Sequence, residues 1–251
     1  EIRAERIGKS FGDHLVLEAI DLEVAREQIV AIVGASGSGK TVLLDLLIGL
    51  LAPDRGRVLV ADHSRPDLPL VDLHAIGEDR RDAVRRHWAV VFQRNALFSG
   101  SVYENLALLL REHTDLGHAG MEARIRESLA AVALDVDDVI FKDRDALSGG
   151  MAKRVAVARA IAIDPVVVFY DEPTTGLDPI VSGHIHELIW NTHHRARADG
   201  TPRTSLIVTH DRELLRRLHP RVVMLHEAKV CYDWPYEAFG APGCAPAREY
   251  L

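Results

Sequence analysis

The sequence predicts an α/β fold with a mostly parallel β-sheet at its centre. Three short apolar runs, rich in β-branched residues, each end in a polar residue, as buried strands of a parallel sheet do. These runs are Ile29 to Val33, Val166 to Tyr170 and Ser205 to Thr209. A glycine-rich turn and a largely apolar helical segment, Val42 to Leu50 with Gly49 inside it, follow the first run. The carboxyl ends of parallel strands meet at one edge of a sheet, so we expect the chemistry there.

The first 24 residues show a different pattern. Apolar and polar residues alternate in Ile2 to Ile7 and in Leu15 to Val24, with a turn signal at Gly12 and Asp13 between them. This alternation predicts an N-terminal antiparallel β flap beside the main sheet.

The middle of the chain reads as helical. Apolar residues recur at helical spacing in Glu122 to Ala133 and in Ala152 to Ile163. We therefore expect one domain over residues 1–251, with a core and flap at about 1–93 and 164–236 and a helical lobe at about 94–163. The charge-rich stretch Asp62 to His87, with Pro66 and Pro69, predicts a solvated loop or insertion, and residues 237–251 a short irregular tail.

Composition narrows the classes of partner. The chain carries 30 basic and 37 acidic residues, a net charge of -7, which argues against nucleic acid as a partner. No apolar run reaches the roughly 18 to 20 residues that cross a bilayer, and the first residues lack the apolar core of a signal peptide. Cys231 and Cys244 have no CxxC spacing, so we expect two thiols, no cysteine-bound metal and a reducing, cytoplasmic location.

The glycine-rich turn after the first strand has the pattern G-x-x-x-x-G-K-[ST]. Its residues are Gly34, Ala35, Ser36, Gly37, Ser38, Gly39, Lys40 and Thr41. Glycines let backbone N–H groups converge on phosphates, and the helix N-terminus that follows favours an anion. Lys40 is expected to contact the β- and γ-phosphates and the Thr41 hydroxyl to bind Mg²⁺. The loop therefore predicts binding of a nucleoside triphosphate.

Two carboxylates follow the apolar run Val166 to Tyr170. Asp171 is expected to hold Mg²⁺, directly or through water. Glu172 comes next and is placed to polarise the attacking water as a general base. Taken without the phosphate loop, the pair would read as the polar end of a strand; with it, hydrolysis is the better interpretation.

A second glycine pair opens the helix near residue 152. Ser148 is a good N-cap, and Gly149 and Gly150 allow an anion to approach the backbone closely. From these residues alone, a capped helix without a ligand is an equally good interpretation.

The ordered set of motifs resembles the nucleotide-binding subunit of ATP-binding-cassette (ABC) transporters. Leu147 to Met151 (LSGGM) resembles the family signature, with Met151 where glutamine is common. The resemblance implies the following roles: Phe11 stacks on adenine, Gln93 meets Mg²⁺ and the attacking water, Asp178 belongs to the D-loop, and His210 is the switch histidine near the γ-phosphate.

The same resemblance implies a head-to-tail dimer. ATP would lie between the phosphate loop of one copy and Ser148 and Gly150 of the other, so that ATP binding closes the dimer. Hydrolysis would reopen it and drive a separate membrane permease. The chain is therefore expected to be an ATPase at the cytoplasmic face of the inner membrane, as a peripheral subunit.

Several segments resemble one branch of the family, the Mla-type ATPases that work with a permease and a lipid-binding MCE protein. These segments are Lys40 to Leu44, Asn95 to Phe98, Val102 to Asn105, Gly149 to Ala162 and Thr174 to Ile180. The resemblance implies movement of phospholipid or another lipid. It also implies that the stretch Asn95 to Arg111 carries the groove for the permease, with Leu97, Phe98, Val102 and Tyr103 as apolar contacts or as interior residues of the lobe.

Three other interpretations remain. The same motor serves other cargoes, such as amino acids, lipoproteins or drugs. A non-transport ABC ATPase of translation or DNA repair usually has paired cassettes or long coiled coils, and this sequence has neither. A small-molecule P-loop kinase would not need LSGGM or the D-loop.

Overall fold

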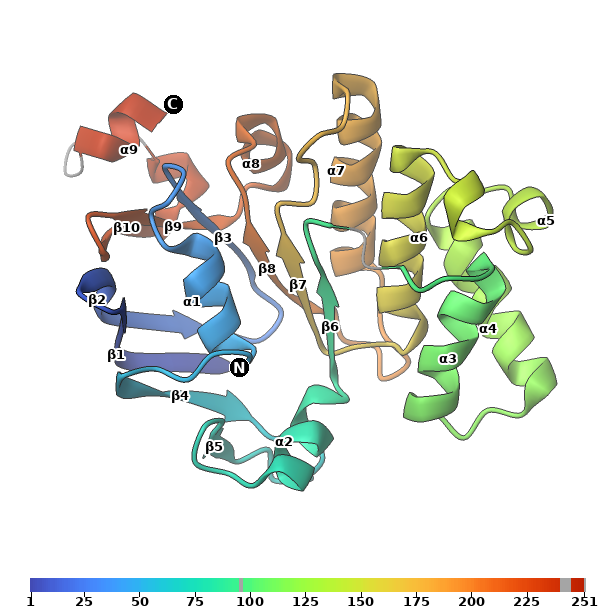
Figure 1. Ribbon diagram of the computed structural model, residues 1–251, viewed down its shortest axis with the longest axis horizontal. Coiled ribbons are helices and arrows are strands. Elements are labelled where there is room, and N and C mark those ends of the chain that lie inside the picture. The colour runs from blue at the N-terminus through green and yellow to red at the C-terminus, as the bar shows by residue number, and fades with distance from the viewer. Residues whose placement is uncertain (95–96, 240–244, 251) are drawn as a thin grey trace. The chain divides into compact units, whose positions relative to one another are not determined.

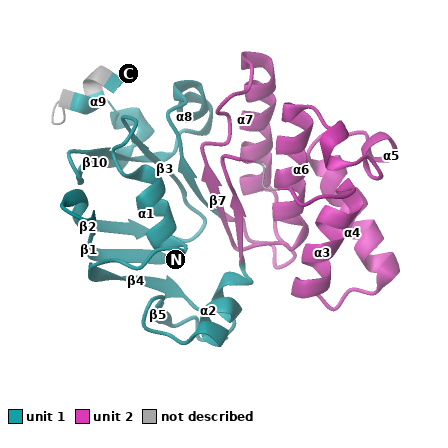
Figure 2. Ribbon diagram, viewed as in Figure 1, with its two compact units in different colours: residues 1–87, 204–251 teal, residues 88–203 magenta. Residues whose placement is uncertain are grey.

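The computed structural model describes residues 1–94, 97–239 and 245–250, with the side chains of 245, 248 and 249 left aside. The chain forms two compact units, which Figure 2 colours separately. Unit 1 contains residues 1–87 and 204–251, and unit 2 contains residues 88–203. The predicted boundaries between core and helical lobe stay a prediction.

Unit 1 begins with an antiparallel sheet. Its strands, in the spatial order β2-β1-β4-β5, are β1 (Ile2–Phe11), β2 (His14–Val24), β4 (Arg55–Ala61) and β5 (Leu70–Asp72). The turn between β1 and β2 uses Gly12 at φ 58°, where a left-handed backbone costs glycine least. Alternate side chains of these strands are buried, because one face of the sheet is covered. The predicted flap is confirmed, with both strands longer than expected.

The second group of strands in unit 1 is mostly parallel. It runs in the order β10-β9-β3-β8 and contains β3 (Ile29–Gly34), β8 (Thr204–Val208), β9 (Arg221–His226) and β10 (Lys229–Pro235). Strand β3 is parallel to β8 and β9, and β10 returns antiparallel to β9. Helices α1 (Lys40–Leu47) and α8 (Arg212–Leu218) follow β3 and β8 (Figure 1). Every residue of β8 is buried, including the polar Thr204 and Ser205 at its start.

Unit 2 packs helices around a parallel pair of strands. The pair is β6 (Trp88–Val91) and β7 (Val167–Asp171). The helices are α3 (Val102–His113), α4 (His118–Ala131), α5 (Val136–Val139), the short 3-10 turn η1 (Arg144–Ala146), α6 (Gly149–Ala162) and α7 (Pro179–His194). Helix α6 contacts α3, α4, α7 and β6, and its alanines and valines are therefore buried on nearly every side. Two of the predicted helices correspond to α4 and α6.

Residues 62–87, expected to be a solvated loop or insertion, are not a loop throughout, although most of them are at least partly exposed. This stretch forms β5 and helix α2 (Glu78–Arg85). Its charges are used inside unit 1: Arg85 donates from Nη2 to the Gly49 carbonyl at 2.6 Å, and Arg80 pairs with the buried Asp62 at 3.2 Å. Gly49 also lies outside α1, just beyond its C-cap, at φ 75°. Arginine-to-carbonyl bonds across the chain explain why a charge-rich stretch is ordered.

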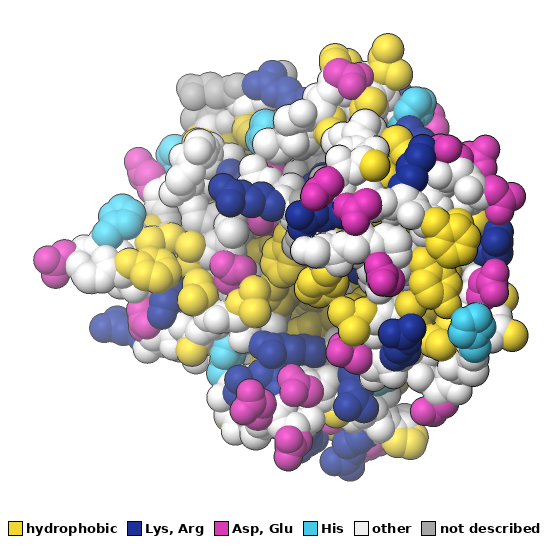
Figure 3. Space-filling view, turned by 45° about the vertical axis from the view of Figure 1, so that its right-hand side comes forward, with side chains coloured by type: hydrophobic (Ala, Val, Ile, Leu, Met, Phe, Trp, Pro, Cys, Tyr) yellow, Lys and Arg dark blue, Asp and Glu magenta, His cyan; other side chains and the backbone are white. Residues whose placement is uncertain are grey.

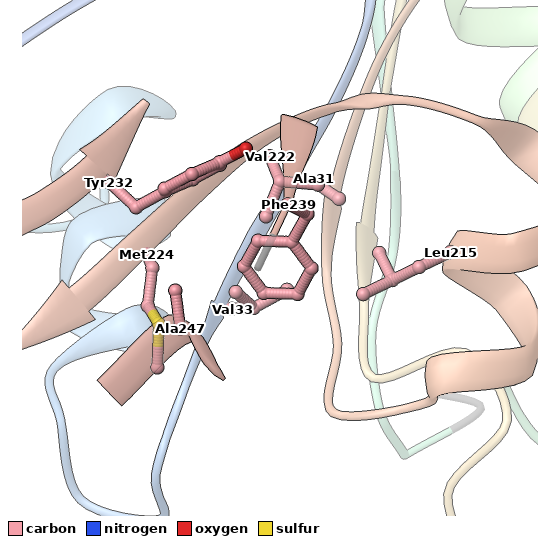
Figure 4. Close-up of a cluster of buried hydrophobic side chains, with 8 residues drawn as sticks. All are labelled: Ala31, Val33, Leu215, Val222, Met224, Tyr232, Phe239 and Ala247. Carbon is pink, nitrogen blue, oxygen red and sulfur yellow. The ribbon is translucent and has the colours of Figure 1, made fainter. Parts of the chain in front are cut away.

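The expectation of an irregular tail is wrong for Ala245–Tyr250, which form helix α9 after a 3-10 turn, η2 (Tyr236–Ala238). Phe239 and Ala247 are buried in a cluster with Met224, Val222 and other residues of unit 1 (Figure 4). The Phe239 ring lies 5.1 Å from that of Tyr232. Burial of these apolar groups holds the end of the chain against β9 and β10. Of the two predicted thiols, Cys231 packs against this cluster, and Cys244 lies outside the described residues.

The surface mixes charges of both signs. On the face drawn in Figure 3, Lys and Arg side chains lie among Asp and Glu side chains. Within the described ranges, no helix has the length and apolar character needed to cross a membrane.

Candidate functional site

The phosphate loop of unit 1 joins the end of β3 to the start of α1. A Cβ on Gly34, at φ 151°, would lie 2.5 Å from the Leu225 carbonyl oxygen, so a side chain there is excluded. Gly39 caps α1 in the left-handed conformation at φ 94°. Glycine at both positions allows the tight turn that a loop needs to bring backbone N–H groups to phosphates.

The side chain of Lys40 lies inside this loop. Lys40 is only 8% exposed, and its Nζ donates to the carbonyl oxygens of Gly34 and Ala35, both at 2.9 Å. The buried Ser38 Oγ has no hydrogen-bond partner among the described residues. A buried ammonium and an unsatisfied hydroxyl at a helix N-terminus are the features of a phosphate site. The chemistry of this loop therefore fits the polyphosphate of ATP.

Two other predicted residues of unit 1 are exposed. His210 follows β8, and the preceding Thr209 donates its N–H to the Ile32 carbonyl on β3 at 3.1 Å. His210 thus stands at the carboxyl end of β8, beside the strand that leads into the phosphate loop. Phe11 ends β1 with 49% of its surface exposed and with Lys9 Nζ 5.6 Å from its ring centroid. An exposed aromatic face of this kind is available for stacking.

Unit 2 places both predicted carboxylates at the end of β7. Asp171 is its last residue and is buried, with 7% exposed. Glu172 follows at φ 46°, a left-handed backbone that is uncommon for a side chain of its size. Its carboxylate accepts a hydrogen bond from the Thr175 hydroxyl at 3.2 Å. Such strain persists where the surrounding structure holds it and is frequent at active sites.

Gln93 reaches the same edge of unit 2. Val91 of β6 is in register with Tyr170 of β7, so the residues that follow both strands lie side by side. A buried lysine that the sequence reasoning missed, Lys153 of α6, holds this segment. Its Nζ donates to the carbonyl oxygen of Gln93 at 2.9 Å and to that of Phe92 at 3.2 Å.

The charge of Lys153 is sensitive to its surroundings. Burial lowers its pKa, and the charge of Asp171 opposes that shift. The signal in the sequence was one lysine at an interior position of an alanine- and valine-rich helix. This pattern shows that the lysine is unusual, but it does not indicate which atoms the lysine contacts.

The glycine pair of unit 2 opens α6. Ser148 is the N-cap, and its Oγ accepts a hydrogen bond from the Met151 N–H at 3.3 Å. A Cβ on Gly150 would lie 2.8 Å from Cγ1 of Val181, in the first turn of α7. Asp178 caps that helix by accepting from the Ile180 and Val181 N–H groups at 3.0 Å. The starts of α6 and α7 therefore lie together, with Ser148 and Gly149 exposed.

The oxygen donors proposed for a metal suit Mg²⁺. The Thr41 hydroxyl and the Asp171 carboxylate are hard ligands, and Mg²⁺ is usually held by one or two such groups together with phosphates and water. The described residues contain no group of three or more His, Cys, Asp or Glu side chains that would form a metal site by itself. Each of these two donors, taken within its own unit, is of a kind that binds Mg²⁺ together with a nucleotide's phosphates.

The ABC transporter family matches residues 17–175 of this chain. The chain belongs to this family. It is 33% identical over 241 residues to the intermembrane phospholipid transport system ATP-binding protein MlaF of Escherichia coli strain K12, covering 96% of this chain and 84% of MlaF. It is 35% identical to protein TRIGALACTOSYLDIACYLGLYCEROL 3 of Arabidopsis thaliana, over 92% of this chain and 68% of the relative.

Another relative is the probable ribonucleotide transport ATP-binding protein mkl of Mycobacterium leprae, 32% identical over 100% of this chain and 68% of mkl. Among solved structures, the ATP-binding cassette MJ0796, described as a dimer in a post-hydrolysis state with ADP and Pi, superposes with a TM-score of 0.79. It is 25% identical, over 94% of this chain and 99% of the cassette. The chain is thus an ABC ATPase that couples ATP hydrolysis to transport, with the predicted α/β fold.

Proposed function

We propose that this chain is the motor subunit of a phospholipid transporter. Two copies bind two ATP molecules head to tail and act on a separate integral membrane permease, with an MCE-type lipid-binding protein in the complex. The subunit lies at the cytoplasmic face of the inner membrane as a peripheral protein, and nucleic acid is not a partner.

The phosphate loop carries the ATPase part of the proposal. Lys40 is buried inside the loop and bonded to two loop carbonyls, so an entering phosphate offers its ammonium a stronger, charged partner. Backbone N–H groups of the loop are proposed to bind the other phosphate oxygens, and the exposed Phe11 ring to stack on adenine.

Hydrolysis is assigned to residues at the strand ends. We assign Glu172 as the base that takes a proton from the attacking water, with Gln93 orienting that water and His210 contacting the γ-phosphate. Thr41, Gln93 and Asp171 would hold Mg²⁺, which neutralises charge on the phosphates when bound. The Thr175 hydroxyl donates a hydrogen bond to the Glu172 carboxylate and so helps to hold the proposed base in position.

The exposed start of α6 supports the dimer. Ser148 and Gly149 are exposed, so this end is accessible to a second copy. A helix N-terminus with glycines binds phosphate well. The cassette MJ0796, which this chain resembles, is described as a dimer bound to ADP and Pi. Ser148, Gly149, Gly150 and Asp178 are proposed to contribute to the partner's ATP site.

The lipid cargo rests on relatives. MlaF is named for phospholipid transport, and the similarity covers 84% of MlaF, against 68% of mkl, whose name refers to ribonucleotides. The match to mkl covers more of this chain, 100% against 96%, so the choice of phospholipid rests on the segments that resemble Mla-type ATPases.

Glu172→Gln tests the catalytic assignment. The amide keeps the shape but accepts no proton, so we expect unchanged ATP binding, a fall in turnover of about 10²–10⁴-fold and an ATP-trapped dimer. Phosphate release and size-exclusion chromatography measure these quantities. Glu227→Gln, an exposed change in the β9–β10 turn, is the control. Wild-type turnover in Glu172→Gln would remove Glu172 from the mechanism.

The cargo is tested with the chain reconstituted in its permease complex. Fluorescent phospholipid should move between vesicles with ATP, and Glu172→Gln should abolish the movement. ATP-driven movement of labelled ribonucleotide, without phospholipid movement, would contradict the lipid proposal while leaving the ATPase assignment intact.

A further inference from the structure

Unit 2 contains a cavity of about 520 Å³ that no residue proposed for ATP lines. Its walls come from α4, the C-terminal ends of α6 and α7, and the segment 195–203. The volume lies within the range of small-molecule sites, about 300–1,000 Å³. Four arginines line it: Arg124, Arg195, Arg197 and Arg203.

Arg203 is the buried centre of this cavity wall, with only 5% of its surface exposed. Its Nη1 donates to the carbonyl oxygens of Thr192 at 3.1 Å and Arg195 at 2.8 Å, and its Nη2 to Asp164 Oδ1 at 2.6 Å. Its Nε–H has no hydrogen-bond partner among the residues that the structure describes. A buried, charged donor left unsatisfied is costly, so this wall carries more donors than acceptors.

Asp164 holds this wall in place. While Oδ1 accepts from Arg203, Oδ2 accepts from the Ala198 N–H at 3.0 Å. One carboxylate therefore fixes both the buried guanidinium and the backbone of segment 195–203. The arginines lie on a preorganised surface, so less conformational entropy is lost when a ligand binds.

Positive charge exceeds negative charge around the cavity. Two carboxylates, Glu127 and Asp164, line it together with the four arginines. Glu127 pairs with Arg195 and lies 3.9 Å from Arg124, and Asp164 pairs with Arg203. Arg197 also pairs with Asp199 at 2.7 Å, which still leaves one positive charge in excess, and Arg197 Nε is a second buried donor with no partner in the described part of the chain. Burial lowers the pKa of Arg203, the charge of Asp164 opposes that shift, and the charges of Arg197 and Arg195 lower the pKa by repulsion. An anion would relieve this repulsion.

We propose that the cavity binds a small molecule through a phosphate group. Guanidinium forks match the oxygens of phosphate in geometry and charge, and they recognise it with paired hydrogen bonds. The phosphate belongs either to a soluble metabolite or to a lipid headgroup, and the experiment separates the two sources. The whole chain has a net charge of -7, so this cavity differs in sign from the chain as a whole.

The probe for the soluble source is glycerol 3-phosphate, titrated by calorimetry into the full chain saturated with Mg²⁺ and ADP. We expect binding in the millimolar range or tighter. Arg124→Gln and Arg197→Gln should each weaken it by at least about tenfold, because each removes a charged donor from the cavity. Arg126→Gln is the matched control: it is on the same helix α4 but pairs with Glu122 and Asp137 and does not line the cavity.

Lipid is tested by sedimentation with vesicles of phosphatidic acid, compared with phosphatidylcholine. Binding to phosphatidic acid that is lost in Arg124→Gln and kept in Arg126→Gln would assign the headgroup as the source and support the site. The proposal is overturned if the wild type binds neither probe, or if Arg126→Gln weakens binding as much as Arg124→Gln. ADP binding in all variants, measured in parallel, shows that each one is folded.

Discussion

At the scale of single residues, Lys153 links helix α6 to the segment that contains Gln93. Lys153 lies on α6, two residues after Met151, and its Nζ donates to the backbone oxygens of Phe92 and Gln93. Keeping a lysine buried costs free energy, as the burial-lowered pKa indicates. A lysine kept there at that cost is best explained by the position it gives to Gln93.

We predict that Lys153→Met lowers kcat by about tenfold with little change in ATP affinity, because Gln93 loses its fixed position while the phosphate loop is untouched. Steady-state kinetics and nucleotide titration separate kcat from affinity. Lys153→Arg keeps a donor and should recover part of the rate, and Lys142→Met, at an exposed ion pair, should change neither quantity. An equal fall in kcat for Lys142→Met would show that the loss of any positive charge lowers the rate, whatever the position of Gln93.

The sequence identified residues whose roles depend on local spacing. Asp171 and His210 were expected at the ends of strands and Lys40 at the start of the helix after the glycine-rich turn, and the structure places them there. The roles of Lys153 and Arg203 were not predicted. Their partners, Gln93 and Asp164, are 60 and 39 residues away along the chain, and only folding brings them together. Spacing along the chain carries no information about such contacts.

At the scale of elements, the starts of α6 and α7 form one packed corner. Gly150 leaves no room for a side chain against Val181, and Asp178 fixes the first turn of α7 from the other side. The first turns of α6 and α7 are therefore closely packed, and we expect a bulkier side chain in one to displace the other.

Gly150→Ala should lower ATPase activity by more than tenfold, since its methyl group meets Val181 Cγ1 and displaces the start of α6. Val181→Ala removes that atom, so the double variant should regain part of the lost rate. Phosphate release is the measurement, with melting temperature to exclude unfolding. If the double variant is as inactive as Gly150→Ala, the methyl group acts on the partner's phosphate and not on α7.

Strands were easier to predict than the charged elements. An unbroken apolar run such as Val167 to Tyr170 has few alternatives to a buried strand. Helix α2 buries only Val84 and is held by arginines that bond to distant carbonyls, so its sequence shows little apolar periodicity. Helix α9 was missed for a related reason, because it packs through Ala247 and Tyr250 against a cluster built elsewhere.

At the scale of the whole molecule, the motifs are divided between the two units. The phosphate loop and His210 belong to unit 1, and Gln93, Ser148, Asp171 and Glu172 belong to unit 2. The order of the motifs was enough to predict the family, since each motif is local. The arginine cavity of unit 2 was not predictable, because α4, α6 and α7 contribute to it from separate parts of the sequence.

We expect the stabilisation of the folded chain by ATP to depend on Mg²⁺. ATP that binds only the folded state raises the free energy of unfolding by about 2.7 kcal/mol at 100 times its Kd, which is roughly 5 to 10 °C in melting temperature for a chain of this size. Removing Mg²⁺ with EDTA should abolish most of this rise, and Asp171→Asn should behave in Mg²⁺ as the wild type does in EDTA. Lys40→Met should show no rise in either condition, and Asp199→Asn, an exposed change outside the phosphate loop and strand ends, should behave as the wild type. A full magnesium-dependent rise in Asp171→Asn would mean that the metal takes its protein ligands elsewhere, because the buried carboxylate at the end of β7 would then make no difference to ATP binding.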